Sequence, residues 1–251
     1  MRILFVTRGF PPEGRWGSEG YAHDLALGLA AEGHEVEVFF PVPGGGSARV
    51  GQRSRPLGGI WIHPLELQRR PGKPFRDSYE DPRQDQALAE LCERRGPFQR
   101  VHFTALGGEV SFGLVRAAKD HGAEVLVHLT EFLPWCHRGQ LLDAELDDCT
   151  GPEPRKCAAC VLRPGPWGRR GVVDRMRRVA QRVLFTLGER TALASPAAFA
   201  LREVEVAAAL ARVDRFFAPS EAIGLRAVEL RPAGRPGRGP AVRSGPSARP
   251  A

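Results

Sequence analysis

Long hydrophobic runs are missing from this chain of 251 residues. No stretch of about 18 uncharged apolar residues occurs, so the sequence predicts no transmembrane helix. The apolar run at residues 1–6 is too short for a signal peptide, and no cleavage site of small residues follows it. The chain holds 29 Gly and 22 Pro, but they lack the three-residue period of collagen. The simplest expectation is a loop-rich cytoplasmic protein.

An excess of acidic residues is missing too, because the formal net charge is +7. The basic residues are concentrated in residues 224–251, where six Arg stand against a single acid, Glu229. This tail carries +5 and leaves +2 for residues 1–223. It is rich in Arg, Pro, Gly and Ala and has few aliphatic residues, so it predicts disorder. The part expected to fold has no basic face, which argues against nucleic acid as a partner.

Short apolar runs alternate with segments of helical period through residues 1–223, which can bury a core because 42% of the chain is hydrophobic. The runs predict strands at residues 2–7, 35–40, 59–65, 100–103, 124–129 and 213–217. The helical patterns lie at residues 18–31, 83–95, 110–121, 172–187 and 196–212. The first helix has its expected N-cap at Ser18 and carries Tyr21, Leu25 and Leu29 on one face. The alternation predicts an α/β fold with a Rossmann-like, doubly wound parallel sheet.

Three glycines, Gly14, Gly17 and Gly20, separate the first predicted strand from the first helix. Backbone N–H groups at a helix N-terminus, uncovered by side chains at glycine, form a seat for phosphate. The spacing G-x-x-G-x-x-G differs from the dinucleotide pattern, and the second strand lacks the terminal acid that would bind a ribose. A nicotinamide enzyme is therefore disfavoured, whereas a phosphate seat and a tight structural turn both stay open.

Four of the five cysteines follow the pattern C-x12-C-x7-C-x2-C within the predicted loop insertion at residues 132–165. Four thiolates satisfy the tetrahedral coordination of structural Zn²⁺, and the C-x2-C pair places two sulfurs on one metal. Disulfides or free thiols are the alternatives, although reducing surroundings favour zinc. The fifth cysteine, Cys92, is expected to be a small buried hydrophobe. The predicted zinc ligands are Cys136, Cys149, Cys157 and Cys160.

An ordered series of short motifs runs through residues 1–223. It consists of Arg2–Thr7, Pro11–Pro12, Gly17–Glu19, Leu25–Ala30, Gly33–Val36, Val101–His102, Leu114–Lys119 and Asp214–Ser220. The series resembles the N-terminal, acceptor-side domain of family 4 glycosyltransferases. Their GT-B fold has two Rossmann-like domains facing each other across a cleft. Residues 132–165 are similar to a Cys-rich insertion that lies near the acceptor side in one branch of that family. The resemblance therefore implies a single N-terminal half of a GT-B fold.

The same resemblance implies a set of site residues. In the family, the Gly-rich loop approaches the diphosphate of a nucleotide-sugar donor, and Gly17 inherits that role by position. A family His-Asp pair, which would contact the transferred sugar or its leaving group, aligns with Thr130 and Glu131. His128 lies on the same strand face two residues earlier, and a purely structural role for it stays open. The implied catalytic residues are His128, Thr130 and Glu131. The implied donor- or acceptor-binding residues are Gly14, Gly17, Ser18, Glu19, His102, Arg138 and Gln140.

The implied activity is that of a retaining, metal-independent transferase that moves a sugar from a nucleotide-sugar to a glycan or lipid-linked acceptor. In the family a second Rossmann-like domain holds most of the nucleotide, and the 28 residues after Ile223 are too few to form one. We therefore expect a truncated protein that is inactive alone, unless a separate chain supplies the donor domain. The alternative is a non-catalytic, zinc-stabilised Rossmann-like module that binds a glycan or a protein.

The predicted helix at residues 172–187 allows contact with a membrane surface. Its apolar residues form one stripe, and four arginines lie largely off that stripe. Such a helix either packs its stripe on the core or rests on an anionic membrane. Peripheral binding at the inner face of the membrane therefore stays open beside a purely cytoplasmic location.

Overall fold

The computed structural model describes residues 1–14, 17–44, 53–68, 75–143, 145–162, 195–230 and 242–244. The helices of this part are α1 (Gly17–Ala31), α2 (Pro82–Arg95), α3 (Gly113–Asp120), α4 (Pro154–Leu162), α6 (Pro196–Leu210) and α7 (Glu221–Glu229), with a 3-10 turn, η1, at Phe75–Ser78. None of these helices is long and apolar enough to cross a bilayer. The predicted helix at residues 172–187 lies outside the described residues.

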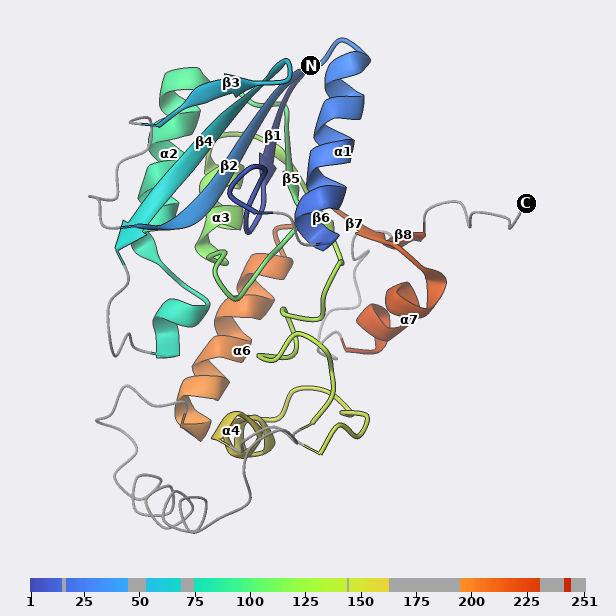
Figure 1. Cartoon of the computed structure of the whole chain (residues 1–251). Coiled ribbons are helices and arrows are strands. Elements are labelled where there is room, and N and C mark those ends of the chain that lie inside the picture. The colour runs from blue at the N-terminus through green and yellow to red at the C-terminus, as the bar shows by residue number, and fades with distance from the viewer. Residues whose placement is uncertain are drawn as a thin grey trace.

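The strands are β1 (Arg2–Val6), β2 (Glu35–Gly44), β3 (Arg55–Leu57), β4 (Ile60–Gln68), β5 (Arg100–Phe103), β6 (Glu124–His128), β7 (Arg215–Ala218) and β8 (Val242–Ser244). They form one sheet in the order β3-β4-β2-β1-β5-β6-β7-β8 (Figure 1). Neighbouring strands are parallel, except β3 and β4, which are antiparallel. The predicted Rossmann-like, doubly wound sheet is confirmed, and β1 and β5 meet at its topological switch point.

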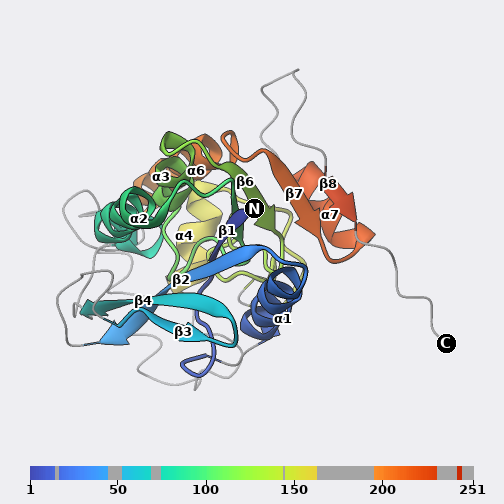
Figure 2. The same cartoon turned by 90° about the horizontal axis from the view of Figure 1, so that it is seen from above.

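Each face of the sheet carries its own hydrophobic core. On one face, Ala26 of α1 belongs to the same buried cluster as Phe5 of β1. On the other face, Leu88 of α2 and Val115 of α3 share a cluster with Phe103 of β5. Figure 2 shows α1 on one side of the sheet and α2, α3 and α6 on the other. Because helices cover both faces, β1 and β6 are buried along nearly their whole length, which explains their continuous apolar runs.

Several elements differ from their predicted form. Sequence analysis missed the short antiparallel strand β3, which Gly58 and Gly59 join to β4 through a turn with positive φ at both residues. The insertion at residues 132–165 was predicted as a loop but contains α4. The N-cap predicted at Ser18 is wrong, because α1 begins at Gly17 and Ser18 lies in its first turn.

The predicted disordered tail needs a correction at its start. The boundary expected at Ile223 falls inside α7, whose first turn is capped by Ser220. Ala227 and Leu230 are buried and belong to the main core cluster of the sheet. These apolar contacts order the start of the tail, although the composition of the tail predicted disorder. Farther on, β8 extends the sheet beside β7. Residues 224–230 are therefore part of the fold.

A buried ion cluster lies near the amino end of β2. The carboxylate of Glu37 accepts hydrogen bonds from Arg2 Nη2 at 3.0 Å and Arg95 Nε at 2.7 Å, and it lies 2.7 Å from His63 Nε2. Burial would raise the pKa of Glu37, but the hydrogen bonds and charges of His63 and Arg95 lower it to about 2. This cluster stabilises the edge of the sheet at the amino ends of the strands. Ligands of such sheets bind at the opposite edge, at the carboxyl ends of the strands.

Candidate functional site

The loops that follow β1, β5 and β6 meet at the carboxyl edge of the sheet. The hydroxyl of Thr130, after β6, donates to the carbonyl oxygen of Thr104, after β5, at 2.9 Å. Arg8, after β1, donates from Nη2 to Oε2 of Glu131 at 2.7 Å. These contacts join the loops on both sides of the switch point. The structure thus brings the predicted residues Thr130 and Glu131 to the edge at which doubly wound sheets bind ligands.

Four aromatic rings form a row across neighbouring strands. The ring of Phe5 in β1 stacks on His102 of β5, with centroids 5.0 Å apart. His102 in turn stacks on His128, the last residue of β6, at 5.3 Å. His128 then stacks on Phe217 of β7 at 5.0 Å. Because Phe5 faces α1, the row lies on the α1 face, and it places the two predicted histidines in direct contact beside the switch point.

Tyr21 of α1 completes a hydrogen-bonded chain with the two histidines, here called the Tyr-His-His chain. Its Oη lies 2.8 Å from Nδ1 of His128, and Nε2 of His128 lies 3.0 Å from Nδ1 of His102. Two proton arrangements satisfy both bonds: the hydroxyl donates to His128 and His128 to His102, or both bonds run in reverse. Tyr21 is 44% exposed and each histidine 8%, so the hydroxyl is the open end of the chain.

Burial keeps both imidazoles neutral near pH 7. It lowers the pKa of His102 to about 4, with a smaller effect from the charge of Arg100. It lowers the pKa of His128 to about 3, with a smaller effect from charge on His102. Burial also raises the pKa of the Tyr21 hydroxyl. A neutral imidazole both donates and accepts a hydrogen bond, whereas an imidazolium only donates. The Tyr-His-His chain is therefore suited to orienting a hydroxyl group as a hydrogen-bond donor or acceptor.

Glu19 packs the Gly-rich loop closely against the start of α1. Its side chain is buried, and a Cβ added at Gly9 or Gly14 would come within 2.6 Å of its carboxylate oxygens. Gly14 therefore faces a carboxylate, which is a poor neighbour for a phosphate. Gly17 is exposed, and no described residue comes within 4 Å of the position its Cβ would occupy. Of the predicted loop residues, Gly17 keeps the backbone space that a phosphate needs, with Ser18 next to it.

A cavity of about 520 Å³ opens beside this loop. Its charged lining consists of one guanidinium and three carboxylates, and its apolar wall comes from the end of β2. The carboxylates accept hydrogen bonds from hydroxyl groups, and the guanidinium donates hydrogen bonds to them. The excess of negative charge in the lining repels a diphosphate. The cavity therefore suits a hydroxyl-rich neutral ligand better than a nucleotide's phosphates. It is lined by Arg8, Gly9, Glu13, Glu19, Phe40, Pro41, Val42 and Glu109.

Sequence reasoning missed two residues of this site, Tyr21 and Arg8. The helical pattern placed Tyr21 on one apolar face with Leu25, yet its hydroxyl bonds His128. Arg8 was part of a loop with no assigned role, yet it pairs with Glu131. Both residues flank the loop after β1, which a doubly wound sheet always brings to its switch point. Their positions at the start of that loop and in the helix that follows it are the signal that could have identified them.

The predicted acceptor contacts Arg138 and Gln140 lie in the insertion. Arg138 donates from Nη2 to the carbonyl oxygen of Cys160 at 3.1 Å, so it supports the cysteine-bearing segment. Gly139 approaches the site, since a Cβ there would lie 3.5 Å from Oε2 of Glu131. Gln140, one residue farther along, is exposed. The insertion therefore borders the loop after β6, with Gln140 at the surface.

The four predicted zinc ligands line one cavity of about 30 Å³. Burial raises the pKa of the Cys157 thiol, and charge on Cys149 and Cys136 raises it further. All five cysteines are free thiols, and Cys92 is buried in the core as predicted. Within the described residues, no group of three or more His, Cys, Asp or Glu side chains is placed so that it could hold a metal ion. The fold gathers the four thiols at one cavity without closing a coordination sphere around it.

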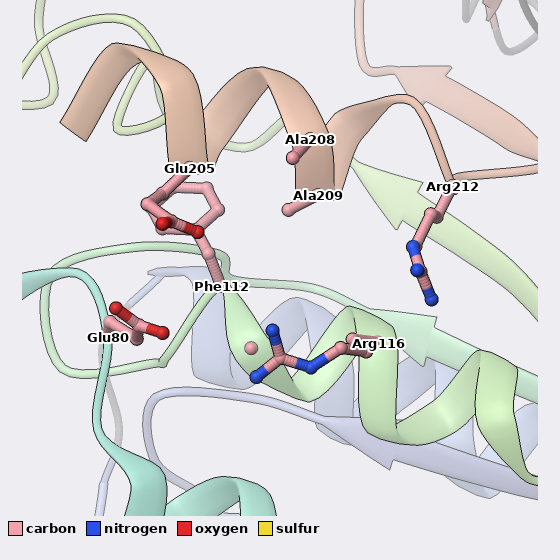
Figure 3. A pocket seen from close by; sticks show the side chains of 8 residues that line it. Glu80, Phe112, Arg116, Glu205, Ala208, Ala209 and Arg212 are labelled. Atoms are coloured by element: carbon pink, nitrogen blue, oxygen red, sulfur yellow. The ribbon is translucent and has the colours of Figure 1, made fainter. Parts of the chain in front are cut away.

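Another cavity, of about 100 Å³, lies between α3 and α6 on the opposite face from the Tyr-His-His chain. Figure 3 shows Arg116 extending from α3 toward Glu80, with Glu205 on α6 above them. Its arginines already have acidic partners, because Arg116 lies 3.5 Å from Asp85 and Arg212 lies 3.3 Å from Asp120. These contacts identify a surface ion network, so this cavity is not a candidate site.

The fold is that of a Rossmann-like α/β protein, and polar side chains gather at its switch point. No protein-family description matches the chain, and no curated protein matches it. Solved structures similar to it include a trehalose-6-phosphate synthase, with 9% identity and a TM-score of 0.46, where the match covers 92% of this chain and 43% of that one.

Two further structures of this kind come from Burkholderia. The α,α-trehalose-phosphate synthase (UDP-forming) of Burkholderia vietnamiensis has 10% identity and a TM-score of 0.43, with 90% of this chain and 41% of that one covered. The enzyme of Burkholderia xenovorans in complex with glucose-6-phosphate has 11% identity and a TM-score of 0.40, with 90% and 42% covered. The chain thus spans about two fifths of the length of these structures.

Proposed function

We propose that this chain is the acceptor-side half of a GT-B glycosyltransferase related to family 4. It would take part in moving a sugar from a nucleotide-sugar to a glycan or lipid-linked acceptor. The observation that carries the proposal is the Tyr-His-His chain at the carboxyl edge of the sheet, with Tyr21 as its open end. The motif series implies a histidine that contacts the transferred sugar at the position of Thr130, and His128 lies two residues earlier at the end of β6.

The chemistry of the Tyr-His-His chain supports a role in binding and orienting hydroxyl groups. Both ring nitrogens of His128 are engaged, one by Tyr21 and one by His102, so a sugar reaches His128 through the Tyr21 hydroxyl or by displacing it. Because both imidazoles are neutral, His128 either accepts from Tyr21 and donates to His102 or donates to Tyr21 and accepts from His102, and neither arrangement contains a charged imidazole. The Tyr-His-His chain would orient a hydroxyl of the acceptor or of the transferred sugar and accept a hydrogen bond from it.

Acceptor and donor would occupy different parts of the edge. The cavity lined by Arg8, Glu13 and Glu19 has the carboxylates that bind sugar hydroxyls, and it would hold the acceptor. The donor's diphosphate would approach the open backbone of Gly17 instead. The described residues form one Rossmann-like sheet, so the nucleotide would be held by a second domain, in the same protein or on a separate chain.

A non-catalytic binding module is the second candidate. The saturated hydrogen bonding of His128 favours it, because a catalytic imidazole needs a free nitrogen or a partner that it can exchange. Such a module would bind a glycan at the same edge without turning over any nucleotide-sugar. The two functions therefore predict the same ligand class and differ in turnover.

The test combines binding with turnover. The ring signals of His102 and His128 are followed by NMR while nucleotide-sugars and sugar or lipid-linked acceptors are added, and release of nucleoside diphosphate is measured in parallel. Saturable shifts of these signals by an acceptor, weakened in Tyr21→Phe and kept in Tyr79→Phe, would support the proposal. Added nucleoside diphosphate release would favour the transferase over the module. Ring signals unmoved by every compound, in folded protein without turnover, would overturn both functions.

A further inference from the structure

A charged residue occupies a core position of α6. The residues that this helix buries recur at helical spacing, and they are Phe199, Arg202, Val206 and Ala209. Three of them are apolar, as a core-facing stripe requires, whereas Arg202 carries a guanidinium and is only 3% exposed. A buried charge costs free energy unless it is paired or hydrogen-bonded. Arg202 therefore breaks the apolar pattern of the stripe, which points to a role beyond packing.

No carboxylate binds this charge within the part of the chain that the structure describes. Arg202 forms no ion pair there, and its Nε is buried without a hydrogen-bond partner. Glu203, the next residue of α6, also has a buried carboxylate oxygen without a partner, so the two side chains do not bind each other. The Cζ atom of Arg202 lies 5.9 Å from the ring centroid of Phe112, which adds a weak cation–π contact.

The guanidinium instead binds main-chain carbonyl groups of the loop after β6. It donates to the carbonyl oxygen of Leu133 at 2.5 Å and to that of Pro134 at 3.5 Å. Both residues belong to a tight turn at residues 132–136, whose internal hydrogen bonds use only the carbonyl oxygen of Phe132. The next two carbonyl groups therefore need donors from elsewhere. Arg202 supplies both donors from one rigid, planar group.

The same turn borders the candidate functional site. Two of its residues line a small cavity together with His128, Thr130 and Glu131. Glu131 directly precedes the turn and binds Arg8, with Oε2 2.7 Å from Nη2. Arg8 in turn lines the cavity of about 520 Å³. A shift of the turn would therefore move the carboxylate of Glu131 and, with it, the guanidinium at the wall of that cavity.

The side chain of Leu133 restricts the turn on its other sides. A Cβ added at Gly107, in the loop after β5, would lie 3.2 Å from Cβ of Leu133. A Cβ added at Gly139, in the insertion, would lie 3.3 Å from its Cγ. Leu133 is thus closely packed between these two segments, and the turn has little room to move toward either. The hydrogen bonds of Arg202 hold the turn from the side of α6.

We propose that Arg202 is a positioning residue of the candidate site. Its guanidinium fixes the turn at residues 132–136, so that Glu131 keeps Arg8 in place at the wall of the larger cavity. The inference rests on the proposed function for the kind of ligand that this cavity takes. The effect of Arg202 on the contact between Arg8 and Glu131 does not depend on any ligand, so the two proposals can fail separately.

NMR of the Arg8 guanidinium tests the proposal without a ligand. A guanidinium held by a carboxylate gives resolved Nη–H signals, because rotation of its terminal nitrogens is slow, and Arg8→Lys assigns these signals. We expect them in the wild-type protein, lost in Arg202→Met, broadened in Arg202→Lys and unchanged in Arg212→Met. Arg212 is the matched control, because it follows α6 and lies 3.3 Å from Asp120 at the surface.

The signals of Arg8 also provide the result that would overturn the proposal. If they are the same in the wild-type protein and in a folded Arg202→Met variant, Arg202 does not position the site. Should Arg202→Met fail to fold, Arg202→Lys decides, because it keeps the charge but lacks the planar fork that reaches both carbonyl groups. Signals identical to those of the wild type in Arg202→Lys would then overturn the proposal.

Ligand binding connects Arg202 to the proposed function. Maltose is the probe, because it is neutral and rich in hydroxyl groups, and its dissociation constant is measured by NMR titration. We expect the constant to rise about fivefold in Arg202→Met and to change less than about twofold in Arg212→Met. Equal affinity of the wild type and a folded Arg202→Met variant would overturn the positioning role and leave the proposed function standing. Failure of maltose to bind the wild type bears on the proposed function alone, and the Arg8 signals still decide the role of Arg202.

Discussion

The hydroxyl of Tyr21 lies 2.8 Å from Nδ1 of His128, although the two residues are 107 positions apart in the sequence. The contact joins the first turns of α1 to the end of β6 across the switch point. It turns two buried histidines into a chain that reaches the surface. The Tyr21 hydroxyl is therefore the group through which a ligand would form a hydrogen-bonded connection to the two histidines.

Tyr21→Phe should destabilise the protein by about 1–2 kcal/mol, because it leaves the buried Nδ1 of His128 without a partner. Urea unfolding at neutral pH measures this change in the free energy of unfolding. Tyr79→Phe is the matched control, since the hydroxyl of this buried tyrosine has no hydrogen bond among the described residues. It should cost less than about 0.5 kcal/mol. Equal losses in the two variants would contradict the importance of the Tyr21 contact.

Acidification should destabilise the fold through His102 and His128. Their pKa values in the folded protein, about 4 and about 3, lie below the value near 6.5 of an unfolded histidine. Between those limits the unfolded chain binds more protons, so the free energy of unfolding decreases as the pH falls from about 6.5 toward 4. By pH 4 the loss is of order 3 kcal/mol for each histidine and should shrink in His102→Gln. NMR of the ring nitrogens should find both imidazoles still neutral at pH 5.

Asp85 should have the opposite pH dependence. Burial raises its pKa to about 6, so its ionised form is penalised in the folded state. Its contribution is most favourable below the unfolded pKa near 4 and is lost as the pH rises through 6. Asp85→Asn keeps an oxygen that accepts from Ser111, whose Oγ lies 2.8 Å from Oδ1. The variant should therefore gain about 1–2 kcal/mol over wild type at pH 7 and little at pH 4. Asp24→Asn, at an exposed position, should show no such difference.

Two glycines of the same loop should respond differently to alanine. Gly14→Ala places a Cβ 2.6 Å from the buried carboxylate of Glu19 and should destabilise the fold by about 1–2 kcal/mol. Gly17→Ala meets no described atom within 4 Å and lies at the start of α1, so the fold should be unaffected or slightly more stable. If the proposed function holds, Gly17→Ala should still weaken nucleotide-sugar binding in titration calorimetry. Equal stability of the two variants would contradict the packing of Glu19.

The sheet could be predicted from the sequence because its strands are buried on both faces. Such strands appear as continuous apolar runs, and β5 was located at its observed bounds, Arg100–Phe103. The short strand β3 could not be predicted, because residues 55–57 include a proline and one exposed position and show no apolar pattern. α7 was missed because its buried residues are the small Gly224 and Ala227, which composition does not mark as core.

The candidate site was predictable in outline. His102 and His128 each lie one residue before the end of a predicted strand, and parallel strands bring their carboxyl ends to one edge, so the fold rule places these two residues together. The contacts of Tyr21 and Arg8 depend on side-chain direction across more than 100 residues, which periodicity does not encode. Gly14 shows the limit of motif reasoning, because a Gly-rich loop looks the same whether it faces a ligand or a buried carboxylate such as that of Glu19.

Both ends of the described sheet are strands of three residues, β3 with Pro56 at its centre and β8 at the other end. The unpaired backbone N–H and C=O groups of an edge strand can pair with the edge strand of a second copy and cause aggregation. Edge strands that are short or contain proline have few such groups available for pairing. The protein should therefore remain unaggregated at the high concentrations that NMR titrations need. Deletion of residues 242–244 would leave the longer β7 as the edge strand and should promote self-association.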